Sequence, residues 1–429
     1  MQNKTPLMIK MTVEHKSWLK SYVDFFKGFA QTDDFKEFIK KINTIENPEH
    51  FIYSSVQPTG LMYGFPIRFS DFDVPGLHDL DDHDKTKMIL IDCLISCSMF
   101  LKTQGVNNEV DMEKMLNEII NNIGDFYSQV FTQNENSANG VAHPDEVEQL
   151  IDKRVSGNKK WNKNFWTSYF QNSLLFLDII YFSRWLQHGD RLRFQKEKED
   201  IYFLIIKIIA ASANANSQIE KEEELLFKNF LDSAKMKEEK VKMANDYFFK
   251  GITLDSIDFS EIDSWVIKKY LLEIAILTIW SDRLLEDSEK NFLVQLNDKL
   301  GFSELELEES MLAIENFVLS NWEKIPYMNE KTDFETIQDN LTERISVAVK
   351  GRMELLGKSF PHSEEFERII NNGSVEKLTD AERKILRGHL LELIKDIPSI
   401  AVFLLPGGSI MLPQLLKVLS SASSGNPEK

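Results

Sequence analysis

Apolar residues recur at helical spacing along most of the chain, and the clearest case lies between Lys85 and Thr103. Its apolar residues fall mostly three or four positions apart, which is typical of a helix; they are Met88, Ile89, Ile91, Leu94, Ile95, Met99 and Phe100. A second amphipathic run covers Met112–Phe131, and Leu174–Phe182 is apolar except for Asp178. This last run is too short to cross a membrane, so we predict a helix buried in the core.

From residue 201 onward, an apolar helix, a short polar turn and an acidic helix occur twice with a shift of 66 residues. The first copy has its apolar helix at 205–213, its turn at 214–219 and its acidic helix at 220–230. The second copy has the same three parts at 271–280, 281–285 and 286–296. Repetition at a fixed offset indicates two copies of one helical hairpin, which we expect to superpose.

A third unit begins near Phe334, because the preceding helical pattern stops at Ile325 and Pro326. Its apolar segment 397–419 is interrupted by two prolines and a Gly-Gly pair, so it cannot form a continuous membrane span. Two interpretations stand: both apolar arms are buried in the unit, or they contact a membrane or a partner, as the flanking lysines would favour. The residues assigned to such a contact are Phe403, Leu404, Leu405, Pro406, Met411, Leu412, Pro413 and Leu416.

The composition supports an all-α protein built from several helical units. Gly at 18 and Pro at 12 of 429 residues are scarce, against average usages of about 7% and 5%. The chain is also longer than the roughly 250–300 residues at which one core stops growing. We predict a helical region at 1–200, an acidic helical domain at 201–325, a third helical domain at 326–420 and a disordered tail at 421–429.

Charge and cysteine content narrow the class of partner and the compartment. The net charge is -18, and residues 218–340 alone carry 28 acidic against 14 basic side chains. A field of that sign repels nucleic-acid phosphates, so we expect no specific DNA binding by this segment. Two cysteines cannot form a disulfide framework and the N-terminus lacks an apolar signal segment, so we expect a cytoplasmic protein, peripheral at the inner face of the membrane if 397–419 meets lipid.

The two repeat turns offer the candidate ligands of a divalent cation. Asn216 and Glu223 of the first copy correspond to Asp282 and Glu289 of the second, and these side chains supply the oxygens that hard cations prefer. Since Asn216 is neutral, we expect a cation to be held weakly and on the Asp282 side. The alternative is helix capping, with Ser217 and Glu220 forming a capping box for the first acidic helix and Asp287 or Ser288 capping the second.

Two further groups of residues have metal-binding chemistry but favour a structural role. The run from Asp71 to Asp84 is rich in Asp and His, yet we interpret it as a solvated loop in which Asp82 or Asp84 opens the next helix. Cys93 and Cys97 lie one turn apart without a second pair of ligands, so we expect both to be buried in the core.

The repeat resembles the TerB-like all-helical fold of tellurite-resistance proteins. Members of that family repeat an Asp-Gly turn, with Ile or Leu three residues after the Asp and Glu seven after it. Here Ile219 and Leu285 fill the apolar position, whereas Ser217 and Arg283 replace the glycine. The resemblance implies a TerB-like helical domain at 201–325, with any cation site weaker than in the family.

The third unit resembles the LETM family of mitochondrial inner-membrane proteins of cation homeostasis and their bacterial relatives, some labelled biofilm-associated. The most specific part is Leu405-Pro406-Gly407-Gly408 followed by Leu412-Pro413. The family's later Leu-Pro-Ser motif is replaced by a serine-rich tail. The resemblance implies a LETM-like helical C-terminal domain at 326–420.

These observations lead to three functional hypotheses, none of them catalytic, because no spacing suggests a paired nucleophile and base. The first is a non-enzymatic binding or scaffold protein of the LETM-related, biofilm-associated type, with an unidentified protein partner and membrane-surface contact. The second is cation binding or an accessory role in cation homeostasis. The third, implied only by the resemblance of the LETM domain to a ribosome-binding module, is association with the ribosome. We expect no cofactor other than a weakly bound divalent cation.

Overall fold

The computed structural model of this chain describes residues 17–70, 77, 80–103, 111–131, 144–155, 173–189, 193–216, 219, 221–279, 286–320, 340, 343–348, 369, 378–394 and 398. Within these ranges every regular element is a helix and there is no β-strand, which confirms the all-α prediction. The contacts divide the chain into two compact units, and the division falls inside helix α9, between Glu199 and Asp200. The predicted boundaries at 325 and 420 lie outside the described residues and stay predictions.

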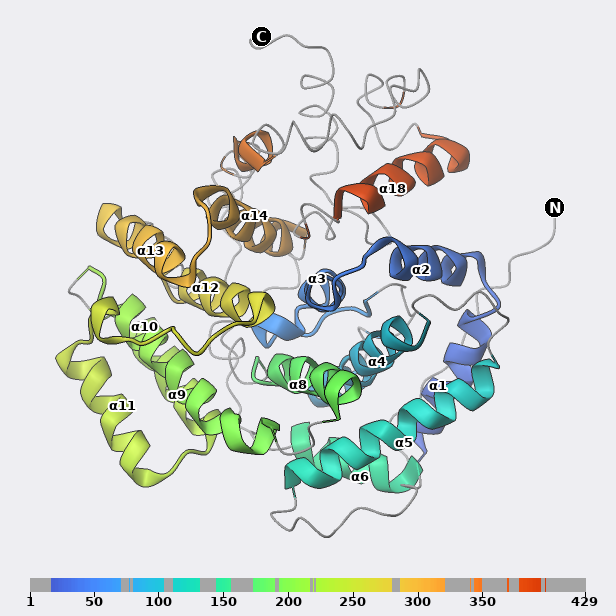
Figure 1. Ribbon diagram of the computed structural model, residues 1–429, viewed down its shortest axis with the longest axis horizontal. Coiled ribbons are helices and arrows are strands. Elements are labelled where there is room, and N and C mark those ends of the chain that lie inside the picture. Colours follow the sequence, from blue (N-terminus) through green and yellow to red (C-terminus); the bar gives the residue numbers. More distant parts are fainter. Residues whose placement is uncertain are drawn as a thin grey trace. The chain divides into compact units, whose positions relative to one another are not determined.

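The first unit is built around α4 (Asp82–Thr103), which is buried along most of its length. Helices α2, α3, α5, α6 and α8 all pack against it (Figure 1). Their bounds are α1 Trp18–Phe29, α2 Asp33–Thr44, α3 Pro48–Val56, α5 Met112–Phe131, α6 Pro144–Val155 and α8 Leu175–His188, with short 3₁₀ turns at Gln57–Thr59 and Leu61–Tyr63. The predicted helices at 85–103 and 112–131 are therefore confirmed, and the apolar run at 174–182 is a buried helix as expected.

Two buried aspartates tie the helices of this unit together. Asp92 of α4 accepts hydrogen bonds from the Tyr22 hydroxyl at 2.7 Å and from the Ser70 backbone amide at 2.9 Å. Asp178 of α8 is fully buried and accepts two hydrogen bonds from Arg154, at 2.7 and 2.9 Å, and one from the Tyr127 hydroxyl at 3.0 Å. Because buried carboxylates are costly unless paired and hydrogen-bonded, both sites specify how α1, α5, α6 and α8 meet.

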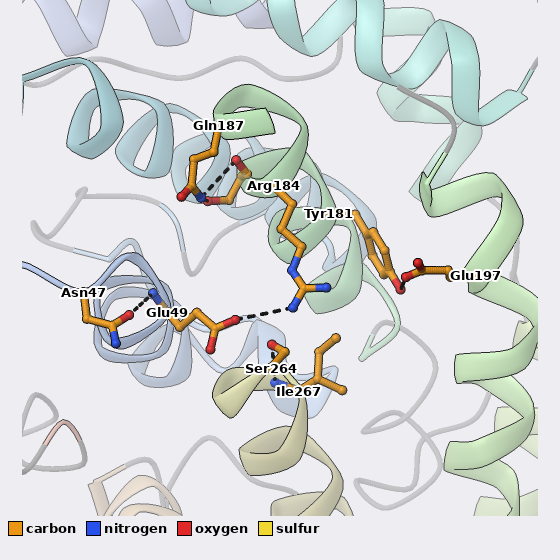
Figure 2. A network of polar contacts seen from close by, with 9 residues as sticks. Asn47, Glu49, Tyr181, Arg184, Gln187, Glu197, Ser264 and Ile267 are labelled. Atoms are coloured by element: carbon orange, nitrogen blue, oxygen red, sulfur yellow. Dashed lines mark hydrogen bonds and ion pairs between the residues drawn. The ribbon is translucent and has the colours of Figure 1, made fainter. Parts of the chain in front are cut away.

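Helix α8 also carries polar contacts through Tyr181 and Arg184 (Figure 2). Arg184 reaches from α8 to Glu49 of α3, where the side-chain nitrogen and oxygen are 3.4 Å apart. One turn earlier, the Tyr181 hydroxyl donates to Glu197 at 2.9 Å. Asn47 caps α3 by accepting from the Glu49 backbone amide, so the carboxylate that Arg184 meets is held at a helix start.

The second unit contains a three-helix element that occurs twice. The first copy consists of α9 (Arg193–Ala213), α10 (Lys221–Ala234) and α11 (Glu238–Lys250). The second consists of α12 (Trp265–Ile279), α13 (Asp287–Leu300) and α14 (Glu304–Ser320). The shift of 66 residues found in the sequence relates the helix boundaries of the two copies. It separates the end of α9 from the end of α12, the start of α11 from the start of α14, and both ends of α10 from those of α13. The repeat therefore extends beyond the predicted hairpin to a third helix.

Side-chain hydrogen bonds and backbone angles also recur in the two copies with the shift of 66 residues. Ser212 and Thr278 occupy equivalent positions, and the hydroxyl of each donates to the carbonyl four residues earlier at 2.8 Å. Lys235 and Gly301, which follow the second helix of each copy, both have left-handed backbone conformations, with φ of 47° and 76°. Since this conformation is strained for any residue with a Cβ, the shared turn geometry is a feature of the repeat rather than of either residue.

Arg344 joins α14 to the short helical segment 343–348 in the same unit. Its Nε donates to Glu315 at 2.8 Å, and its Nη1 forms an ion pair with Glu308. Glu315 has no exposed side-chain surface, and its second oxygen has no hydrogen-bond partner among the described residues. Burial raises the pKa of Glu315 to about 7, although the neighbouring guanidinium of Arg344 opposes the shift.

The raised pKa of Glu315 predicts a pH-dependent contribution to stability. The carboxyl stays protonated in the folded unit up to about pH 7 but ionises above pH 4.5 in the unfolded chain, so the folded unit loses stability as pH rises between these values. We expect Glu315→Gln, which stays neutral, to become more stable relative to the parent chain between about pH 5 and about pH 8. Denaturant unfolding of both proteins at the two pH values measures this difference, and a constant difference would contradict it.

The last described helix, α18 (Asp380–Ile394), opens with the Thr379 hydroxyl and amide both donating to Glu382, at 2.7 and 2.8 Å. The Glu382 amide donates back to the Thr379 hydroxyl at 3.3 Å, which completes a capping box.

Among the described residues, no helix has both the length and the apolar character that a membrane crossing requires.

Candidate functional site

Within the second unit, a predicted cation ligand of the first copy contacts a predicted ligand of the second copy. Asn216 follows α9 of the first copy, and Glu289 lies in the first turn of α13 in the second. The Asn216 Nδ2 donates to Glu289 Oε1 at 3.2 Å, across 73 residues of sequence. The cation hypothesis grouped Asn216 with Glu223 and Asp282 with Glu289, each pair within its own copy, so this contact between the copies was not predicted.

Glu223 and Glu289 hold equivalent places in the two copies. Each is the third residue of its helix, and the side chains are only 3% and 1% exposed. Glutamate is rarely buried to this degree unless it is paired with another group. The helix N-terminus carries a partial positive charge that favours a carboxylate there, and this stabilises both residues near the turns.

Glu289 also has a capping role. Its Oε2 accepts from the Glu286 backbone amide at 2.8 Å, and together the two residues form a capping box at the start of α13. A cap was expected at this helix start, but the predicted residues were wrong: Glu286, and not Asp287 or Ser288, takes the N-cap position. The Glu-x-x-Glu spacing of 286 and 289 was the available signal, though glutamate is an uncommon N-cap.

The distance between Asn216 and Glu289 also suits the binding of one cation by both side chains. An oxygen in place of Nδ2 would lie 3.2 Å from Glu289 Oε1. Two oxygens at that separation can both reach a Ca²⁺ ion, whose ligands lie at about 2.3–2.6 Å. Rotation of the Asn216 amide by half a turn would place Oδ1 there, so the same two side chains can form a hydrogen bond without an ion and act as ligands with one.

Asp282, the remaining predicted ligand, lies outside the described residues. So do all the residues assigned to membrane or partner contact, namely Phe403, Leu404, Leu405, Pro406, Met411, Leu412, Pro413 and Leu416. Ser217, which the capping alternative invoked for the first copy, is also outside. Among the described residues, the contact between Asn216 and Glu289 therefore joins predicted ligands of the two copies.

The acidic run before α4 contains a second group of metal-type ligands. Ligand atoms of Asp81, His83 and Asp84 lie within 4.8 Å of one another. However, Asp84 forms an ion pair with the buried Lys87 at 2.7 Å, and Asp81 accepts from the Asp84 backbone amide at 2.8 Å. Asp82 is the first residue of α4, as predicted, while the side chain of Asp81 caps the helix. These contacts give the group a structural role.

The two cysteines are buried in α4, as expected from their spacing on one helix face. Cys97 is 2% exposed, and burial raises the pKa of its thiol to about 12, against a smaller opposite effect of its hydrogen bond with Ser183. A thiol in this state is neither a nucleophile nor a metal ligand at neutral pH.

Comparison of the chain with family models, curated proteins and solved structures found no match.

Proposed function

We propose that this protein is a non-enzymatic binding protein whose repeat unit binds a divalent cation between its two turns. The observation that carries the proposal is the contact between Asn216 and the buried Glu289, which joins the turn of the first copy to the start of α13 in the second copy. The 66-residue shift makes Asp282 the sequence counterpart of Asn216, so the ligand set comprises Asn216, Glu223, Asp282 and Glu289. Oxygen ligands of this kind favour Ca²⁺, Mg²⁺ or Mn²⁺ over softer metals.

The scaffold role at a membrane surface and the ribosome-associated role remain expectations from the LETM resemblance. Their residues lie in segment 397–419, of which only Pro398 is described. No contact of a described residue favours either role over the other. Cation binding is therefore the function that we advance from the geometry.

Calorimetric titration with calcium, magnesium and manganese chlorides tests the proposal. We expect Glu289→Gln to weaken binding by about tenfold, because ligand charge sets the affinity of oxygen sites. Gln can still accept the capping hydrogen bond from Glu286, so the start of α13 is retained. We expect Asn216→Asp to tighten binding by a similar factor, since it supplies a second charged ligand at the contact.

The matched control is Glu224→Gln, which removes the same charge one residue from Glu223. Glu224 is exposed and pairs with Lys228 on the surface of α10. The affinity of the Glu224→Gln variant for the divalent cation should match that of the parent chain. Equal affinities for the parent, Glu289→Gln and Asn216→Asp would refute the assignment of these residues as ligands.

A further inference from the structure

A pocket of about 530 Å³ lies in the second unit, between α13, α14, Asn340 and the segment 343–348. This volume falls within the range of about 300–1,000 Å³ that is typical of ligand sites. Its charged lining comes from Lys290 of α13, Glu304 and Glu308 of α14, and Glu343 and Arg344 of the segment. None of these residues belongs to the cation site proposed above.

The guanidinium of Arg344 is already neutralised inside the unit. It forms ion pairs with Glu308 and with Glu315, and only 16% of its side-chain surface is exposed. Two carboxylates therefore surround one guanidinium. An anionic ligand would have to displace a buried glutamate to bind Arg344, which makes this pocket unsuited to phosphate or carboxylate groups.

The accessible charge of the pocket is negative. Glu304 and Glu343 are both exposed, and neither forms an ion pair within the described part of the chain. Among the described lining residues, Lys290 is the only other basic side chain. The sequence from 218 to 340 carries a net charge of -14, a sign that favours cationic partners for this part of the chain.

The same pocket has an apolar wall, formed by Leu305 and Val347. Val347 is 41% exposed, one of the few large apolar side chains in the described ranges with so much accessible surface. An apolar wall beside carboxylates is complementary to a lysine side chain, whose methylene groups pack on apolar surface while its ammonium group meets the negative charge. A bare metal ion would make no use of this wall.

We propose that the pocket docks a lysine side chain from a basic segment of a partner protein. The ammonium group pairs with Glu304 and Glu343, and the methylene stem packs on Leu305 and Val347. Lys290 lies in the same lining and opposes the incoming charge, so it limits the affinity. The expected partner therefore presents lysine in an exposed segment of positive charge.

Fluorescence anisotropy with a labelled hexalysine peptide tests the proposal on the full chain, at about 0.1 M salt where the screening length is about 10 Å. We expect the double variant Glu304→Gln, Glu343→Gln to weaken binding by about fivefold, since exposed ion pairs are each worth a fraction of a kcal/mol to about 1 kcal/mol. We expect Lys290→Gln to tighten binding, and Val347→Ser to weaken it without any change of charge.

The control is the double variant Glu238→Gln, Glu239→Gln, which removes the same charge from exposed positions of α11 in the same unit. If attraction to the acidic surface alone held the peptide, both double variants would weaken binding equally, and the pocket would be ruled out. Absence of hexalysine binding, or an unchanged affinity in Lys290→Gln, would also overturn the proposal. Neither result would bear on the cation site, whose residues are different.

Discussion

Asp178→Ala is expected to destabilise the first unit by about 3–5 kcal/mol, the range observed when one partner of a buried ion pair is removed. The Asp178 carboxylate is fully buried and is bound by Arg154 of α6 and Tyr127 of α5. Removal of the carboxylate leaves the Arg154 guanidinium, on a side chain that is only 18% exposed, without its Asp178 partner. It also removes the contact that α5, α6 and α8 share. The loss should therefore exceed the value of any single hydrogen bond.

Hydrogen exchange of the α4 amides measures this change in the first unit alone, whereas global unfolding of a two-unit chain need not be two-state. The control is Asp33→Ala, which removes the same side chain from a surface ion pair with Lys36, where both partners are more than 70% exposed. This control should change stability by less than about 1 kcal/mol. Replacing both Arg154 and Asp178 by apolar residues should recover part of the loss, because no charge is then left unpaired. A loss below about 1 kcal/mol for Asp178→Ala would contradict the argument.

Phe248→Ala should have an effect of similar size in the second unit, about 3–5 kcal/mol. Phe248 of α11 is fully buried, and its ring stacks on that of Phe227 in α10 with centroids 4.1 Å apart. Truncation removes the whole ring and leaves a cavity that a close-packed core cannot easily fill. This contact holds α11 on the preceding helix, so α11 should lose protection from hydrogen exchange first.

The adjacent residue gives a matched control. Phe249 lies on the same helix but is 55% exposed, and its ring meets only the edge of the cluster, 5.2 Å from Phe248. We expect Phe249→Ala to cost less than about 1 kcal/mol, because most of its surface already contacts water. Equal effects of the two substitutions would show that the buried stack is not what holds α11 in place.

The sequence predicts the helices of this protein well because their apolar spacing is regular. The runs at 85–103 and 112–131 became α4 and α5 almost unchanged. The repeat also located the ends of α9 and α12 to within one residue, whereas α10 and α13 each run four residues beyond their predicted ends at 230 and 296. What escaped notice was the third helix of each copy, because α11 and α14 differ in composition: Glu238–Lys250 is strongly polar, whereas α14 contains the apolar stretch 311–314.

The functional contacts were harder to predict, because they depend on how separate segments pack. The pairing of Asn216 with Glu289 joins residues 73 positions apart, and no local pattern records it. The cap of α13 was assigned to the residue types that usually occupy it, but the chain uses Glu286. The pocket beside Arg344 depends on segment 343–348 meeting α14, which the helical spacing of that segment does not reveal.

The three-helix repeat bears on how this unit covers its apolar helices. Helix α12 is buried around its whole circumference and packs against α10 of the other copy as well as α13 and α14 of its own. A single copy would leave that face of its apolar helix open to water, so it would need a second apolar surface to cover it. Two copies in one chain cover that face without association between molecules, although they differ in sequence at Asn216 against Asp282 and at Lys235 against Gly301.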